Sequence, residues 1–339
     1  MSKGSAETVP NAAIDRRFIV QIAERSMGWP FRSWGFGEAI LLEGLMAAAE
    51  VTGRRDFFGF VHGLARASLG RGVGKVPEDH AAPGRIFLTL HEKLEDAAFL
   101  DAAKSLAILH WTFPKNSAGA RMPRAHVPGW RAQIWVDSMD IGPPFLAHLA
   151  AVTGDESIYD EACAELLAYA RLLQEKSGLF RHGYEETCGP NGQIWARGNG
   201  WALLGMVETL ALLPLRHPAR VEILQRIREL LGGLMRRQRE DGLWHTIVDD
   251  PATYAESTLA AIVATGVRRA VTAGCDLPFG AAEMAERAYA GVLSKVTPDG
   301  GLQNVTDATP VGERTMYATR PFGIFPWGQG PLLLMVCQQ

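Results

Sequence analysis

The chain has 339 residues and a formal charge of −3, from 34 Lys plus Arg against 37 Asp plus Glu. The charges form no basic block, which argues against a nucleic acid partner, because phosphate binding needs a concentrated cationic face. The length is above the usual prior for one domain, but helical barrels of this size form one core. We expect residues 1–339 to form a single domain, with roughly the first ten residues flexible.

The N-terminal stretch and the cysteines bear on the cellular compartment. Residues 1–18 lack the charged and apolar regions of a signal peptide, and no apolar run is long enough to span a bilayer. We therefore expect a cytoplasmic protein with no membrane partner. The four cysteines form no CxxC pair, which favours reduced core residues over a disulfide framework or a zinc site: Cys163, Cys188, Cys275 and Cys337.

Helical patterns follow one another in pairs along the chain. An amphipathic helix is predicted at 12–27 with no partner before it, and the last apolar stretch, "GQGPLLLMVCQ" at 328–338, has no partner after it. Between them we predict five pairs of an apolar inner helix and an amphipathic outer helix, at 35–70, 84–111, 140–173, 200–238 and 256–295. Pairing the first helix with the last closes a ring of six hairpins, roughly 56 residues each.

The fourth pair shows the contrast between the two kinds of helix. Residues 200–214 are apolar almost all round, which predicts burial on every side. The following helix, 219–238, has one apolar stripe and should be buried on one side only. The stripe consists of Leu224, Ile227, Leu231 and Leu234.

Short Gly-Leu segments follow three of the predicted outer helices. They are "GLFRHGYE", "GLWHTIV" and "GLQNV", beginning at Gly178, Gly242 and Gly301, and they carry most of the weak strand signal. We interpret them as equivalent loops or small β-hairpins gathered at one end of the ring. The sequence thus predicts an all-α toroid with its functional site at that end.

Polar and aromatic residues are concentrated in the same loops. A sugar site needs aromatic faces beside carboxylates and forked donors, because a pyranose offers apolar C–H faces and hydroxyl edges. The candidates are Asp79, His80, Trp135, Asp137, His182, Trp195, Arg197, Trp201, Trp244, His245 and Trp327.

Each candidate also has a structural interpretation. Trp195 and Trp201 could be core residues at the rim of the ring, since large aromatics are usually well buried. Arg197 could cap a helix end or clamp a substrate carboxylate. His182 could be a structural histidine, and the functional case for His245 is weaker still.

The motif search leaves carboxylates as the source of chemistry. The histidines do not fall at metal-ligand spacing, and the acidic clusters lack the calcium-loop pattern, so we expect no metal. No GxSxG, P-loop or dinucleotide motif is present, and "GRGVGK" at 70–75 lacks the required spacing, so we expect no cofactor.

Asp137 remains ambiguous on this evidence alone. It precedes the apolar helix, with Asp140 and Ile141 three and four positions on, so it could simply stabilise the helix N-terminus. Most aspartates near helix starts do this and nothing more.

Six stretches together resemble the unsaturated glucuronyl and rhamnogalacturonyl hydrolases, glycoside hydrolase families 88 and 105, and more closely the latter. They run in family order over roughly residues 30–335. The stretches are "PEDHAAPGRIFLTL", "QIWVDSMDIGPPFLAHLAAVTGDESIYDEA", "GLFRHGYEE", "IWARGNGWALLGMVETLALLP", "DGLWHTIVDDPATYAEST" and "WGQGPLLL".

This resemblance implies an (α/α)6 barrel and removal of a 4,5-unsaturated uronate from lyase-generated oligosaccharides such as those of pectin or rhamnogalacturonan. It assigns Asp137 as general acid and base, with Asp79 as the other site aspartate. It implies that the reaction starts by hydrating the C4=C5 vinyl ether, so one carboxyl group that gives and takes a proton suffices where an ordinary glycosidase needs two. We expect a raised pKa for Asp137, from desolvation against Trp135 or from a second carboxylate such as Asp79.

The resemblance also implies that His182, Arg197 and Trp201 hold the uronate and its ring. We add four loop residues to the expected sugar-binding set because of their aromatic or polar character: Trp135, Trp244, His245 and Trp327.

Three features depart from the family pattern. Trp327 replaces a common His, Tyr184 replaces a common Trp, and the segment "PRAHVPGWRAQ" before Asp137 is divergent and could line the aglycone side. The aglycone and the oligomeric state therefore stay open. Other functions also remain: a hydrolase of unsaturated glucuronyl or ulvan-type oligosaccharides, a different toroid enzyme such as an epimerase or a saturated-glycoside hydrolase, and a non-catalytic sugar-binding protein.

Overall fold

The protein is described from a computed structural model that covers residues 15–31, 34–74 and 79–338. The N-terminal residues expected to be flexible, and positions 12–14 of the first predicted helix, lie outside the described residues.

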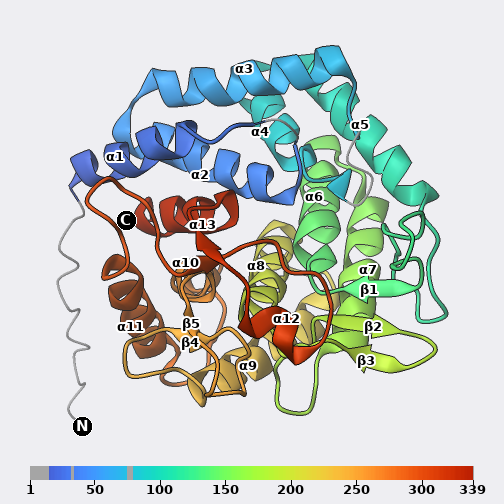
Figure 1. The fold of residues 1–339 in the computed structure, drawn as a ribbon. Helices are drawn as coiled ribbons and strands as arrows, with labels where there is room; N and C mark the ends of the chain where they lie inside the picture. Colours follow the sequence, from blue (N-terminus) through green and yellow to red (C-terminus); the bar gives the residue numbers. More distant parts are fainter. Residues whose placement is uncertain (1–14, 32–33, 75–78, 339) are drawn as a thin grey trace, which may run out of the picture.

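Six inner helices form a closed ring in which each packs against the next (Figure 1). Four of the six are predominantly apolar on every side, which suits helices that are buried both by their inner neighbours and by the outer helices. The inner helices are α2 (Phe36–Thr52), α4 (Gly84–Leu94), α6 (Ser138–Thr153), α8 (Ala196–Leu212), α10 (Thr258–Thr272) and α13 (Pro326–Val336).

Six outer helices surround this ring, each antiparallel to an inner partner. The first, α1, packs against both α2 and α13, so the two unpaired ends of the chain close the ring as predicted. The expected (α/α)6 architecture is confirmed. The outer helices are α1 (Arg16–Met27), α3 (Arg55–Arg71), α5 (Ala97–Thr112), α7 (Glu156–Leu173), α9 (Ala219–Met235) and α11 (Ala281–Leu293).

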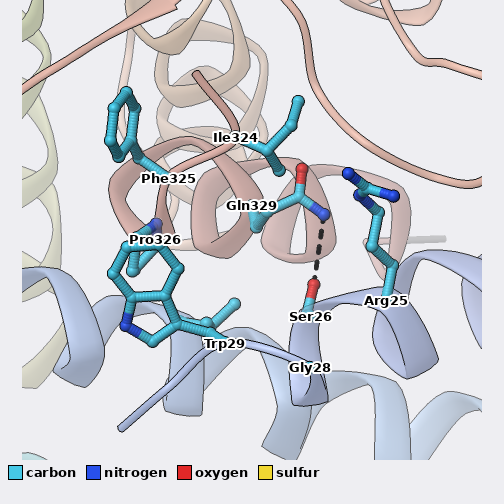
Figure 2. A pocket seen from close by; sticks show the side chains of 9 residues that line it. Arg25, Ser26, Gly28, Trp29, Ile324, Phe325, Pro326 and Gln329 are labelled. Carbon is cyan, nitrogen blue, oxygen red and sulfur yellow. Dashed lines mark hydrogen bonds between the residues drawn. The ribbon is translucent and has the colours of Figure 1, made fainter. Parts of the chain in front are cut away.

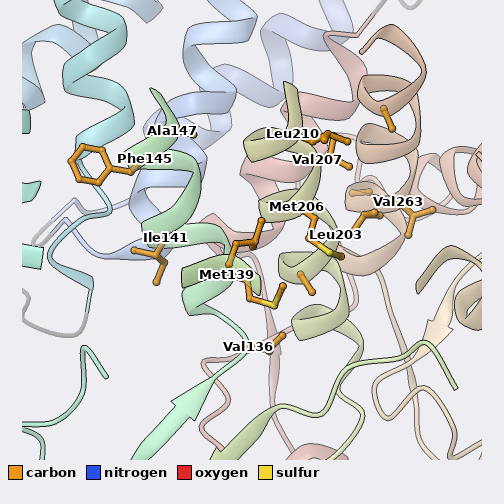
Figure 3. Packing of buried hydrophobic residues seen from close by; sticks show 14 of the residues in the cluster. Val136, Met139, Ile141, Phe145, Ala147, Leu203, Met206, Val207, Leu210 and Val263 are labelled. Atoms are coloured by element: carbon orange, nitrogen blue, oxygen red, sulfur yellow. The ribbon is translucent and has the colours of Figure 1, made fainter. Parts of the chain in front are cut away.

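Burial follows the predicted contrast between inner and outer helices. Fourteen of the 17 residues of α8 are buried, against six of the 17 in α9. Figure 3 shows how α6, α8 and α10 pack, with Met139 on α6 near Leu203 and Met206 on α8. The α9 stripe packs on the core as predicted, with Leu224 only partly buried at its edge and Ile223 and Leu230 buried in addition.

Glycine turns after α7, α9 and α11 pack against the next outer helix along the ring. Gly178 and Gly242 have φ of 85° and 81°, and a Cβ on either would lie about 2 Å from the carbonyl oxygen of Glu229 or Arg287. In the third turn the left-handed residue is Gly300 (φ 84°), one position before the expected glycine. A fourth glycine turn, at Gly119 (φ 83°) after α5, has no neighbour within 4 Å of a Cβ, and it escaped prediction because no Gly-Leu pair marks it.

Short antiparallel strands and one short helix lie at the end of the ring where the inner helices begin, in the lower half of Figure 1. The strands lead into α6, α8, α10 and α13, so the helix N-termini and their partial positive charges face this end. The sheets are β1 (Gln133–Trp135) with β2 (Gly183–Glu185) and β3 (Gly189–Asn191), β4 (Trp244–His245) with β5 (Ala255–Glu256), and β6 (Val305–Thr306) with β7 (Phe322–Gly323). The short helix α12 (Arg314–Ala318) lies between β6 and β7.

Two of the properties expected from the sequence concern the membrane and the cysteines. Among the described residues, no helix combines the length and the apolar character needed to cross a bilayer. All four cysteines are free. Cys188, however, is exposed beside the β2–β3 turn, so its assignment to the core was wrong.

Candidate active site

Asp137 lies where β1 ends and α6 begins. It occupies the N-cap position, yet its backbone is already helical (φ −53°, ψ −34°) and its side chain makes no capping hydrogen bond. An N-cap residue normally has an extended backbone and accepts a bond from the first turn. The structure therefore does not support the capping interpretation, and the carboxylate is available for another role.

His182 faces Asp137 across the β1–β2 pair. The backbone N–H of Val136 donates to the carbonyl of His182 (2.9 Å), which brings the two side chains together. Nε2 of His182 lies 3.3 Å from Oδ2 of Asp137, within ion-pair distance, and neither of these buried atoms has a hydrogen-bond partner elsewhere among the described residues. The side chain of Asp137 is 15 % exposed and that of His182 not at all, and the exposed part of Asp137 does not include Oδ2.

The charges around Asp137 reverse the expected pKa shift. Burial raises the pKa and is the largest single influence, but the hydrogen bond and charge of His182 and the charge of Arg124 outweigh it and lower the pKa. Burial also lowers the pKa of His182, so its neutral form is the resting one and Arg124 supplies the lasting positive charge. The predicted rise is therefore wrong for the unliganded site.

Arg124 is the central residue that sequence reasoning missed. Its guanidinium lies 4.3 Å above the Trp135 ring, 3.8 Å from Oδ1 of Asp79 and 3.4 Å from Oγ of Ser138. It is almost fully buried, and its Nε–H has no partner among the described residues. The divergent segment 123–133 was the only signal for it, because a lone arginine in an irregular loop carries no periodicity.

Asp79 lies at the N-terminus of α2, beside Arg124. Its Oδ2 accepts a hydrogen bond from the backbone N–H of Phe36 (3.0 Å), and its other oxygen faces Arg124. The structure thus brings Asp79 toward the site, but with a guanidinium against it. The main influences on the pKa of Asp137 are burial, His182 and Arg124, so the expected rise caused by Asp79 is not supported.

The Arg197 guanidinium is already hydrogen-bonded within the protein, so it is not fully available to bind a substrate carboxylate. Its Nη atoms donate to the carbonyls of Thr306 and Asp307 at 3.0 Å, and Glu256 lies 3.5 Å away. The guanidinium also lies over the rings of Trp195 and Trp327, at 4.5 and 5.6 Å. Within the described residues Nε–H makes no hydrogen bond, so it is the donor left for a ligand.

The remaining aromatic candidates separate into two groups. Trp201 is fully buried in an apolar cluster inside the ring, with its ring 4.7 Å from Phe36, and Trp327 is partly exposed with Nε1 donating to Thr306. Trp135 contacts the ring of His182 at 5.5 Å. Trp135 thus lies beside the Asp137–His182 pair, whereas Trp201 and Trp327 belong to the neighbouring aromatic cluster of Trp195.

Trp244 and His245 are placed elsewhere. Trp244 is fully buried in the main core, with Nε1 donating to the carbonyl of Leu234, and His245 bonds Arg239 and Thr253. In the described part of the chain neither contacts the group around Asp137. Their assignment to sugar binding is therefore not supported, because β4 directs these side chains toward α9 and its loop.

A surface hollow lies next to Phe325, the neighbour of Trp327. Figure 2 shows it at the seam between α1 and α13, with Trp29, Phe325 and Gln329 on its wall. Its volume is about 280 Å³. Phe325 lines it and also stacks on Trp327 (4.8 Å), so one ring separates the seam from the Asp137 region.

Comparisons with known proteins agree on the family. The profile of Glycosyl Hydrolase Family 88 matches residues 13–339. The unsaturated rhamnogalacturonyl hydrolase YesR of Bacillus subtilis is 26% identical over 321 residues, covering 92% of this chain and 91% of that protein. An unsaturated 3S-rhamnoglycuronyl hydrolase of Alteromonas is 27% identical over 173 residues, covering 49% and 42%. A crystal structure from Salmonella enterica, described as a possible member of the GH105 family, superposes with a TM-score of 0.90 at 22% identity, covering 99% and 98%.

Proposed function

The chain belongs to glycosyl hydrolase family 88, and we propose that it removes a 4,5-unsaturated galacturonyl residue from the non-reducing end of pectin or rhamnogalacturonan oligosaccharides made by lyases. The observation that carries the proposal is the uncapped Asp137 carboxylate paired with His182 at the mouth of the ring. The galacturonyl substrate rests on the name of the Bacillus relative, which matches nearly the whole chain.

The proposed reaction hydrates the vinyl ether of the uronate. Asp137 gives a proton to C4, and the resulting cation at C5 is stabilised by the ring oxygen. Water adds to C5 and returns a proton to Asp137. The hemiketal so formed opens and releases the aglycone, so the net change is addition of water with no oxidation.

The unliganded site holds Asp137 ionised, whereas this reaction needs its acid form. Binding of the substrate would shift Asp137 from its ionised form to this acid form. The uronate carboxylate brings a like charge beside Asp137 and expels water, and both changes raise the pKa of an aspartate. With Oδ2 facing His182, the other oxygen is the one that exchanges the proton with C4.

The same region suits an anionic sugar. Inner-helix N-termini point toward it, and Arg124 and Arg197 each keep an Nε–H without a described partner. We assign these two donors to the uronate carboxylate, and the faces of Trp135 and Trp327 to the sugar rings. Trp201 supports the floor of the site from within the ring.

A second candidate substrate is an ulvan-type oligosaccharide ending in an unsaturated uronate linked to sulfated rhamnose. It is favoured by the match to the 3S-rhamnoglycuronyl hydrolase, which covers about half of this chain. The site chemistry would be unchanged, because only the aglycone differs.

Loss of ultraviolet absorbance from the conjugated double bond tests the proposal. Wild-type protein should bleach unsaturated rhamnogalacturonan and galacturonan disaccharides, and the faster one identifies the aglycone. Asp137→Asn should lower kcat/KM by about 10³-fold or more, because an amide cannot shuttle the proton. Asp249→Asn, on an exposed carboxylate, is the matched control and should keep full activity.

Two results would count against the proposal. Full activity of Asp137→Asn would remove its assigned role and favour a sugar-binding or different catalytic function. Cleavage of a saturated glycoside without any change in absorbance would exclude hydration chemistry.

A further inference from the structure

Tyr317 is the second polar neighbour of the His182 ring. It lies in α12 and is fully buried, and its hydroxyl is 2.6 Å from Nδ1 of His182. The hydroxyl of Tyr254 donates to the Tyr317 carbonyl (2.5 Å), which fixes α12 against the β4–β5 hairpin. Gly192 leaves the room for the Tyr317 hydroxyl, because a Cβ there would lie 2.8 Å from it.

The rest of the His182 environment is apolar. The ring is enclosed by the rings of Trp195 at 4.4 Å and Trp135 at 5.5 Å. Its two nitrogens therefore meet two polar groups only among the described residues: Nδ1 faces Tyr317, and Nε2 faces Oδ2 of Asp137 at 3.3 Å. A neutral imidazole has one proton to distribute between these two contacts.

The partners decide which nitrogen carries that proton. An ionised carboxylate can only accept a hydrogen bond. If Nε2 carried no proton, its lone pair would face the lone pairs of Asp137 Oδ2 and the contact would be repulsive. A tyrosine hydroxyl can donate or accept, and burial raises the pKa of Tyr317, so it keeps its proton. Only one arrangement satisfies both contacts: the hydroxyl donates to Nδ1, and Nε2–H donates to Asp137.

We propose that Tyr317 is a positioning residue that holds the His182 proton on Nε2, facing Asp137, and thereby commits Oδ2 of Asp137 as an acceptor. The other oxygen of Asp137 then remains free to exchange the proton with substrate. The catalytic part of this inference rests on the proposed function, whereas the state of the His182 ring does not.

Nitrogen-15 NMR of histidine-labelled protein tests the ring state directly. The His182 signals are assigned by their loss in His182→Asn. In the wild type at pH 8, Nδ1 should have the shift of an unprotonated acceptor and Nε2 that of a protonated nitrogen. In Tyr317→Phe, Nδ1 loses its donor and should move toward the free or protonated shift. A proton on Nδ1 in the wild type, or unchanged His182 shifts in Tyr317→Phe, would overturn the proposal.

Tyr254→Phe is the matched control for the packing of α12. It removes a hydroxyl that holds the same short helix but does not face His182, so the His182 shifts should stay as in the wild type. If Tyr254→Phe shifts them as Tyr317→Phe does, the effect comes from movement of α12 and the tautomer argument is wrong.

Kinetics test the link to catalysis. Tyr317→Phe should lower kcat by about 10- to 100-fold with little change in KM, the cost typical of losing a group that orients a functional histidine. If kcat of Tyr317→Phe equals that of the wild type, Tyr317 has no positioning role in catalysis, even if NMR supports the tautomer. Absence of hydration activity in the wild type would instead refute the proposed function and leave the NMR result standing.

Discussion

Asp137 and Asp140 lie one turn apart on α6, and their pKa values move in opposite directions. Burial raises the pKa of both, but only Asp137 has His182 and Arg124 beside it to reverse the effect. Asp140 is 4 % exposed, its Oδ1 has no hydrogen-bond partner among the described residues, and its pKa rises to about 7. It faces charges from α2, α4 and α10, namely Glu43, Arg85 and Arg269, with Glu208 of α8 paired to both arginines.

The raised pKa of Asp140 predicts how stability depends on pH. A carboxyl group whose pKa is higher folded than unfolded binds more protons in the folded state, so stability falls as pH rises from its ordinary value of 3.8 to about 7 and then levels off. The loss is at most about 4 kcal/mol. Asp140→Asn removes the titration, so it should exceed the wild type in stability at both pH 5 and pH 8, and by about 2 kcal/mol or more extra at pH 8. Urea unfolding followed by circular dichroism at the two pH values measures this.

Asp249→Asn again serves as the control, and it should keep the pH dependence of the wild type because that side chain is exposed. If Asp140→Asn lost stability between pH 5 and 8 as steeply as the wild type, Asp140 would not be the titrating group.

Single residues were predictable from the sequence where a motif or a helix boundary marked them. Asp137 was found this way, although its pKa was not, because the charges that lower it come from two other segments. Arg124 and Tyr317 could not be found, since Arg124 belongs to an irregular loop and Tyr317 to a five-residue helix, and both reach the site only through tertiary packing. Trp244 shows the reverse error, because aromatic character in a loop does not reveal which way the side chain points.

At the level of the secondary-structure element, the repeated unit is a helix hairpin followed by a glycine turn. The periodicity predicted the hairpins correctly, because inner and outer helices bury different fractions of their surface. It could not decide which residue of Gly300 and Gly301 takes the left-handed conformation, since both are glycine and only the contact with α1 distinguishes them.

Alanine substitutions at two glycines with positive φ distinguish the cost of backbone strain from the cost of a steric clash. Gly154 (φ 72°) ends α6 with no neighbour within 4 Å of a Cβ, whereas a Cβ on Gly178 (φ 85°) would overlap the carbonyl oxygen of Glu229. Gly154→Ala should cost about 1 kcal/mol for the left-handed backbone alone. Gly178→Ala should cost about 3 kcal/mol or more, because α9 must also move. Chemical denaturation of both variants measures the difference, and equal costs would mean that the turn does not hold α9.

For the molecule as a whole, the critical step is closure of the ring where its two ends meet. Two unpaired helices at opposite ends of the sequence were enough to predict this closure, and α1 does pack on α13. The composition of the site was less predictable. Closure brings together loops from 79–83, 113–137, 178–195 and 305–325, and only the closed ring determines which of their side chains meet.

Gln329 joins three segments at this seam. Its amide donates to Ser26 of α1 (3.2 Å) and to the Gly300 carbonyl (3.0 Å), and it accepts from the Leu302 N–H (2.7 Å), as Figure 2 shows in part. The side chain is 3 % exposed, so water cannot replace it freely. It is the polar link between the first helix, the turn after α11 and the last helix.

Gln329→Leu should therefore weaken the whole ring. The substitution keeps the volume roughly constant but leaves the Leu302 N–H and the Gly300 carbonyl buried without partners, at a cost of about 2 to 4 kcal/mol. Gln225→Leu, on the exposed face of α9, is the control and should change stability by less than about 0.5 kcal/mol. Because the seam joins the two ends of the chain, its loss should also expose α1 and α13 together, which amide hydrogen exchange would detect as faster exchange in both helices. Faster exchange confined to α1 would show that α2 and α10 alone hold α13. The contact between α1 and α13 would then be local, and the stability of the ring would not depend on it.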